Sequence, residues 1–184
     1  TLEEELHKID PTAYVTGEGA LDKDLVTVAD HDFNIVNYVS TIAVFIIIAI
    51  VFKSLTIPIV LVSAIELAIF INMGIPYFTN IPIPFISSIV IGTIQLGATI
   101  DYSILMTSRY REERTVFHQP RKQAVINTVA SCASSIITSG MCFFAATIGV
   151  VFVSKIDLIK SICSMLARGS VISVCVILFI FPAL

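Results

Sequence analysis

The sequence has few charged residues and no tryptophan. Only 14% of its 184 residues are charged and 56% are hydrophobic, whereas about a quarter of the residues are charged in soluble globular proteins. So little charge cannot cover the surface of a soluble enzyme, supply the basic surface of a nucleic-acid-binding protein, or keep a tail disordered. These three classes are therefore excluded, and with them nucleic-acid partners.

The cysteines also lack the neighbours that disulfide frameworks and metal sites need. All four lie in apolar stretches, with no C-x-x-C pair and no histidine nearby: Cys132, Cys142, Cys163 and Cys175. We expect free thiols that pack as small hydrophobic side chains. We expect neither a metal nor another cofactor.

The charges that are present gather at one end of the chain. Nine of the fourteen acidic residues lie within the first 32 residues, beside two lysines, which gives this segment a net charge of −7. The remaining 152 residues carry +4. The chain opens on Thr1 without a signal peptide and closes on the apolar Leu184, so both ends look like cuts through a longer protein. We predict an acidic head over residues 1–34 and a membrane domain over residues 35–184.

Five stretches are apolar enough, and long or nearly long enough, to cross a bilayer, which takes about 20 residues. They cover about residues 35–52, 57–75, 85–108, 124–153 and 168–184. Backbone groups cannot stay unpaired in hydrocarbon, and the sequence shows no barrel pattern. The predicted fold class is therefore all-α integral membrane, a five-helix transmembrane bundle.

Two of these spans have boundaries set by single residues. Pro76 is expected to end the second span, because proline breaks helices. Charges at Lys155, Asp157 and Lys160 interrupt the start of the fifth, so we expect an amphipathic turn at the interface and a span from about Arg168. Arg168 is interpreted as an anchor at the membrane interface.

Lysine and arginine counts predict the orientation. The turn at Lys53 and the loop over residues 109–122 fall on one side and carry six basic residues, whereas the other side has Lys155, Lys160 and the acidic head. The six-base side should be cytoplasmic. We therefore expect a multi-pass protein of the cell membrane with an extracytoplasmic N-terminal segment and a cytoplasmic C-terminus.

Two acids lie inside spans, where an unpaired carboxylate costs about 2.5–3.5 kcal/mol. At 1.5 Å per residue, Glu66 lies roughly 14 Å from the inner end of its span and Asp101 roughly 12 Å from Arg109, hence at similar depth. If they face each other, both cannot be ionised at once. A carboxyl group that is neutral when dry and ionised when wetted meets the requirement for a proton carrier. For Glu66, a structural hydrogen bond is the alternative.

Small and polar residues surround Asp101. Gly97 and Ala98, one turn earlier, leave room for another helix to approach closely. Tyr102 can donate a hydrogen bond, and Gln95 adds a polar group higher in the helix. The fourth span carries a polar stripe at spacings of three, four and three, which either lines a hydrated path or cements helices: Thr128, Ser131, Ser135 and Thr138.

These residues resemble a known family. The stretch GTIQLGATIDY, from Gly92 to Tyr102, with the RYREE that follows, resembles the fourth transmembrane helix of MMPL-type transporters of the resistance–nodulation–division (RND) superfamily. Residues 124–149 resemble the fifth helix, residues 168–184 the sixth, and residues 65–72 the third as it occurs in Gram-positive members. The head, with YVTGEG at residues 14–19, is similar to the end of an extracytoplasmic porter domain, which implies a short α/β remnant over residues 1–34.

The resemblance implies a function. Such proteins have two similar halves of six helices, each with a large external domain after its first helix, and export lipids or hydrophobic drugs by proton influx. Asp101 and Tyr102 would be the proton relay, and further relay or coupling residues would be Glu66, Gln95, Ser135 and Thr138. The implied partners are protons, a lipid or other hydrophobic cargo, membrane lipids, and a second half of the transporter or another protomer.

Two other functions stay distinguishable from export. A non-transporting module of the same fold, resembling a sterol-sensing domain or a secretion accessory, would show a missing or degenerate acid in the other half. An intramembrane aspartyl protease needs two catalytic aspartates, and the spans contain only Asp101. We therefore interpret the protein as a transporter and not as an enzyme.

Overall fold

The computed structural model describes residues 18–79 and 85–183, and every regular element within these ranges is helical. The long helices are α2 (Glu18–Phe52), α3 (Thr56–Thr79), α4 (Phe85–Thr115), α5 (Arg121–Val153) and α6 (Asp157–Cys175). A π-helical turn, η1 (Val176–Ile180), and a 3-10 turn, η2 (Phe181–Ala183), continue α6. Within the described ranges five helices are long and apolar enough to span a membrane. The predicted five-helix membrane bundle is confirmed.

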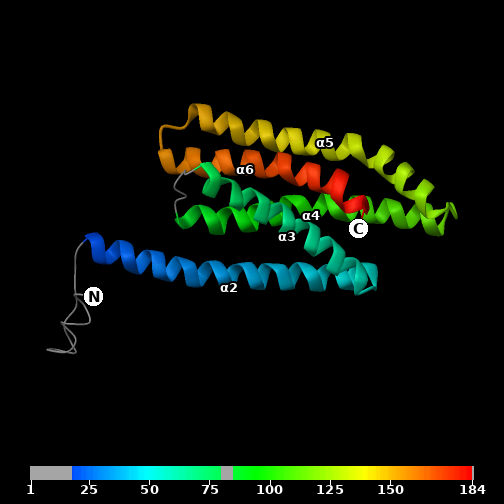
Figure 1. The fold of residues 1–184 in the computed structure, drawn as a ribbon, viewed down its shortest axis with the longest axis horizontal. Helices are drawn as coiled ribbons and strands as arrows, with labels where there is room; N and C mark the ends of the chain where they lie inside the picture. The colour runs from blue at the N-terminus through cyan, green and yellow to red at the C-terminus, as the bar shows by residue number, and fades with distance from the viewer. Residues whose placement is uncertain (1–17, 80–84, 184) are drawn as a thin grey trace.

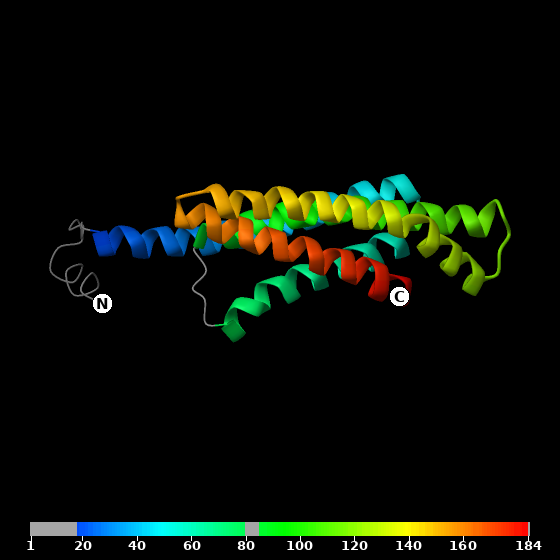
Figure 2. The ribbon, with the colours of Figure 1, turned by 90° about the horizontal axis from the view of Figure 1, so that it is seen from above.

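The helices lie in three layers around α4. In Figure 1, α5 and α6 run along one side, α2 runs along the other, and α3 and α4 lie between them. Figure 2 shows that α3 crosses the bundle obliquely. Helix α4 contacts each of the other four long helices. The candidate acid Asp101 is thus carried by the central helix.

The two outer helices expose most of their apolar surface. In the most apolar window of α2 and of α5, 11% of the residues are buried, against 39% in α3 and 44% in α4 and α6. In water such a surface would be unstable, but in a bilayer it faces hydrocarbon at no cost. The described residues therefore form a multi-pass membrane protein, with α3, α4 and α6 at its centre.

The first four predicted spans lie within α2 to α5, although α3 continues past Pro76 to Thr79, and the fifth helix begins earlier than expected. Instead of an interfacial turn followed by a span from Arg168, α6 is a continuous helix from Asp157, and its membrane-spanning stretch is Asp157–Ala183. Its first turn is amphipathic, with Lys160 close to Asp157, and no residue there breaks a helix. Charges in that turn can reach water at the membrane surface, so they do not interrupt the helix.

Helix α2 begins well before the predicted first span. It runs without a break from Glu18 to Phe52, and no glycine or proline occurs after Gly19. Residues 18–34, assigned above to the head, are therefore helical. The rest of the predicted α/β remnant, residues 1–17, lies outside the described residues.

Close contact between α5 and α6 depends on a glycine. A Cβ atom added to Gly140 would collide with the Val174 side chain, and the Ser170 hydroxyl donates to the Gly140 carbonyl at 2.8 Å. Because Gly140 has no side chain, the backbones of α5 and α6 come close enough for the Ser170 side chain to bridge them.

Candidate functional site

Asp101 lines an open cavity of about 370 Å³ between α4 and α5. Ala98, Tyr102 and Leu105 of α4 form one wall, and α5 contributes Ser135, Ile136, Ser139 and Phe143. The Asp101 side chain is exposed on the surface of the bundle. The structure therefore brings four of the predicted residues to one cavity: Ala98, Asp101, Tyr102 and Ser135.

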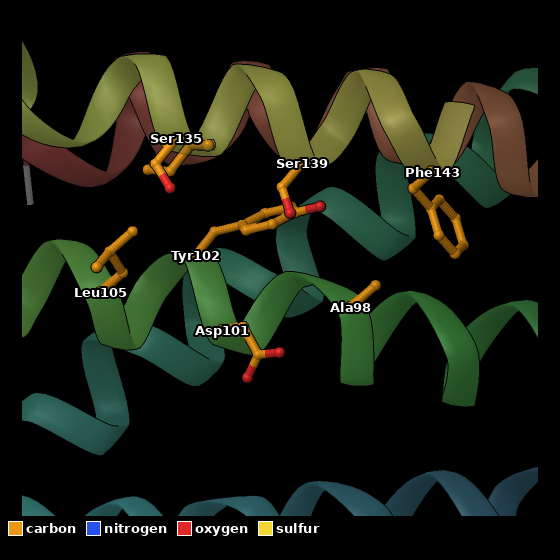
Figure 3. A pocket seen from close by; sticks show the side chains of 8 residues that line it. Ala98, Asp101, Tyr102, Leu105, Ser135, Ser139 and Phe143 are labelled. Atoms are coloured by element: carbon orange, nitrogen blue, oxygen red, sulfur yellow. The ribbon is translucent and has the colours of Figure 1, made fainter. Parts of the chain in front are cut away.

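Asp101 and Tyr102 point to different sides of α4, because consecutive residues on an α-helix are about 100° apart. Tyr102 is only 8% exposed and packs with Met106, Cys132 and Ile136. Figure 3 shows its hydroxyl beside Ser139 of α5, while the Asp101 carboxyl points away from α5. The carboxyl is thus accessible from outside the bundle and the phenol is held inside it.

The polar stripe of α5 does not act as one surface. Ser135 lines the cavity, but the Thr138 hydroxyl donates to the Ser134 carbonyl of its own helix at 2.8 Å, and Ser131 is exposed elsewhere. The spacing predicted Thr138 beside Ser135, but Ser139 is the residue that lines the cavity there. Both positions lie close to one turn from Ser135, and only the contact with Tyr102 distinguishes them.

Glu66 on α3 has a hydrogen-bond partner on α2. The Thr41 hydroxyl on α2 donates to its Oε1 atom at 2.8 Å. This bond ties α2 to α3 in the partly buried interior, as the structural interpretation of Glu66 expects. Asp101 lies on α4 and lines the cavity with α5, and no hydrogen bond joins the two acids in the described part of the chain.

Gly97 faces open space. A Cβ atom added there would meet nothing within 4 Å, whereas one added to Gly169 of α6 would lie 2.6 Å from the Asn72 amide nitrogen and 2.7 Å from Gln95 Oε1. Within the described chain, the close approach predicted at Gly97 occurs at Gly140 and Gly169 instead. Gly97 remains on the open side of α4, available to a helix from outside the described residues, whereas Ala98 lines the cavity with α5.

Gln95 is the centre of a buried polar network that joins three helices. Its Oε1 atom accepts from Asn72 Nδ2 of α3 at 2.8 Å, and its Nε2 atom donates to Ser173 Oγ of α6 at 3.1 Å. Thr99 of α4 donates to the same Ser173 oxygen at 2.9 Å. The buried side chains of Asn72, Gln95, Thr99 and Ser173 thus all have partners, which makes the network a strong constraint on helix positions.

Arg168 completes this network, so its assignment as an interface anchor is wrong. Its Nε atom donates to Asn72 Oδ1 at 3.0 Å and its Nη2 atom to the Asn72 backbone carbonyl at 3.2 Å. That carbonyl is free because the residue four positions later is Pro76, which has no N–H to donate. Pro76 lies inside α3 instead of ending it, and the arginine replaces the missing helical hydrogen bond.

A narrow gap connects the network with Tyr102. It has a volume of about 10 Å³ and touches Tyr102 as well as Gln95, Thr99 and Ser173. A single water needs roughly this much space and several polar partners, both of which the gap offers. Asn72, Ser139 and Ser173 were not among the predicted residues; Pro76, four residues after Asn72, is the one signal in the sequence that marks a carbonyl in need of a donor.

Comparison with known proteins assigns the chain to a family. The model of the MMPL family matches residues 2–184. The chain belongs to the MMPL family. Members of this family are membrane transporters and not enzymes, so at the level of the family the chain is a transporter-like membrane module.

The MMPL chain is also similar to a curated protein. Over 179 residues the chain is 26% identical to "Putative membrane protein YdgH" of Bacillus subtilis (strain 168). The match covers 91% of this chain but 19% of the relative, so the chain spans about a fifth of that protein's length. No solved structure matches the chain.

Proposed function

We propose that this MMPL chain is part of a proton-driven exporter of lipids or other hydrophobic molecules in the cell membrane, with Asp101 and Tyr102 as the proton relay. The observation that carries the proposal is the Asp101 carboxyl. It lies within a membrane-spanning stretch of the central helix and lines a cavity with Ser135, Ser139 and Tyr102. An ionisable group at such depth is costly and is kept where it moves ions or protons.

The surroundings of Asp101 support a change in protonation. Its carboxyl is accessible from the open side of α4, on the side that faces away from α5. Tyr102 leads from this cavity to the gap beside Gln95 and Ser173. Protonation of Asp101 removes a charge from the helix that contacts all the others, which changes the packing that the bundle prefers.

The driving force is adequate for such a cycle. One proton moving across the whole membrane potential provides about 2.3 kcal/mol per 100 mV. The open side of α4, with Gly97 and Asp101, would receive helices of a second half or another protomer. The end of the bundle that carries Lys53 and the loop over residues 109–122, called the basic end below, would face the cytoplasm. The start of α2 would face the outside.

A single substitution tests the relay. In the full-length protein, Asp101→Asn keeps the shape and hydrogen-bonding capacity of the side chain but cannot ionise. We expect at least a 10-fold loss of the protonophore-sensitive export of a fluorescent lipid that the wild-type protein exports, with unchanged amounts of protein in the membrane.

Asp157→Asn is the matched control, because its side chain is fully exposed at the start of α6. It should export at the wild-type rate. Export by Asp101→Asn that is as fast and as sensitive to protonophore as that of the wild type would disprove the relay and favour the non-transporting, sterol-sensing-like module.

A further inference from the structure

A second cavity, of about 750 Å³, lies at the basic end of the bundle, away from Asp101. It is enclosed by the start of α3, the end of α4, the start of α5 and the η2 turn. Figures 1 and 2 show these segments together at the end of the bundle where α4 passes into α5. We call this cavity the basic pocket.

Three positive charges without carboxylate partners line the basic pocket. They belong to Arg114 at the end of α4 and to Arg121 and Lys122 at the start of α5. Within the described part of the chain none of them forms an ion pair, because Glu112 and Glu113 bind Arg109 at 2.6 and 2.9 Å. The field inside the basic pocket is therefore positive.

The start of α5 adds to this field. Its N-cap is Pro120, which offers no side-chain acceptor to the first backbone N–H groups of the helix. Unsatisfied N–H groups and the positive end of a helix dipole favour an anion. Cations and helix end thus meet at the same side of the pocket.

An independent observation lies deeper in the same pocket. The Thr128 side chain is 2% exposed, lines the basic pocket, and its Oγ1 atom is buried without a hydrogen-bond partner in the described structure. Buried hydroxyl groups almost always have partners. Thr128 lies two helical turns from Arg121, roughly 10 Å along the helix, so an ion as small as free phosphate cannot bind at both places.

Most of the remaining wall is apolar, although Thr56, Thr107 and Tyr110 also line it. Ile57, Val60 and Leu61 of α3 face Val125 and Phe181 across the pocket. Its volume falls within the range of small-molecule sites, which are mostly apolar with a few placed polar groups. The charged side chains match a phosphate, and the buried Thr128 hydroxyl matches an ester carbonyl. The apolar walls match an acyl chain.

We propose that the basic pocket binds a phospholipid with an anionic headgroup, such as phosphatidylglycerol, from the leaflet that faces the basic end. The phosphate lies at Arg114, Arg121 and Lys122, an ester carbonyl accepts from Thr128, and acyl chain fills the apolar part. The cytoplasmic leaflet has a negative surface potential that attracts clusters of basic side chains, and it is the side predicted for this end. The site is separate from the proton relay and does not depend on it.

Lipid binding to the purified full-length protein in an uncharged detergent tests the proposal. Native mass spectrometry would compare phosphatidylglycerol with phosphatidylcholine of the same chains, and would use glycerophosphoglycerol and inorganic phosphate as competitors. We expect phosphatidylglycerol to bind at least 10-fold more tightly than phosphatidylcholine. Neither competitor should displace it at equal concentration.

Variants locate the binding. Arg121→Gln and Lys122→Gln should each weaken phosphatidylglycerol binding several-fold, and Val125→Trp, which fills the apolar part, should reduce it as strongly. Lys53→Gln is the matched control, because Lys53 is exposed at the same end but does not line the pocket. Asp101→Asn should also bind normally, so failure of the relay and failure of this site are distinguishable.

Four results would overturn the proposal. They are equal binding of the two lipids, displacement by inorganic phosphate, a loss in Lys53→Gln as large as in Arg121→Gln, and unchanged binding in Val125→Trp. Thr128→Val, which keeps the shape of the side chain, should weaken phosphatidylglycerol binding without lowering the melting temperature, and unchanged lipid binding in this variant would also contradict the assignment of the ester contact.

Discussion

Single residues decide how closely the helices approach. Gly169 faces the amide groups of Asn72 and Gln95 with no room for one more carbon, while Gly74, two residues from Asn72 on the same helix, faces open space. Two glycines close together in the structure thus have opposite tolerance. Only the first has a structural reason to be glycine.

Substitution of these two glycines should separate their roles. Gly169→Ala should cost about 1–3 kcal/mol, because Asn72 or Gln95 must leave its position to admit the methyl group. Gly74→Ala should be neutral or slightly stabilising, since alanine favours a helix more than glycine does. The measurement is the melting temperature of the full-length protein in detergent, and equal melting temperatures for both variants would contradict the predicted clash.

At the scale of helices, α3, α4 and α6 are held together by the Asn72 side chain. It donates to Gln95 of α4 and accepts from Arg168 of α6, whose second hydrogen bond repairs the gap that Pro76 leaves in α3. A helix interrupted by proline is therefore stabilised by a cation from a neighbour. This pairing also keeps a guanidinium group inside the bundle without a carboxylate partner among the described residues.

The interdependence of Asn72 and Arg168 can be measured by a double-mutant cycle. Asn72→Leu should lower stability by about 1–3 kcal/mol, because it leaves a partly buried guanidinium without its side-chain acceptor. Arg168→Met removes the cation, and the double variant should cost clearly less than the sum of the two. Additive effects on the melting temperature would show that the two residues act independently.

These elements show what the sequence could and could not predict. Apolar stretches bounded by charges located four spans, and depth along the helices singled out Asp101. The start of α6 was missed because charges in a first turn look like a break until their access to water is known. Arg168 was misassigned because its partner Asn72 lies 96 positions away, and nothing local indicates such a contact.

The whole molecule has one basic end. Lys53, with a left-handed φ of 49°, and His118, with a φ of 52°, lie in the two turns at this end. The opposite end contains the junction of α5 and α6, where Lys155 lies. Because basic loops are retained in the cytoplasm, this asymmetry predicts the orientation of the entire bundle.

Labelling of introduced cysteines tests that orientation. In a full-length protein whose native cysteines are replaced by serine, a thiol reagent that does not cross membranes should modify Lys155→Cys in intact cells. It should modify Lys53→Cys and His118→Cys only after the membrane is opened. The reverse pattern would invert the topology and move the basic pocket to the outer leaflet.

Helix α2 is 35 residues long, which makes it roughly 52 Å at 1.5 Å per residue, well beyond the hydrocarbon thickness of about 30 Å. Its beginning at Glu18 and its bond from Thr41 to Glu66 are separated by one stiff rod of roughly 35 Å. No hinge lies between these two points to absorb motion. A sideways displacement of the N-terminal end of α2 is therefore transmitted along the helix, as by a lever arm, to the hydrogen bond between Thr41 and Glu66.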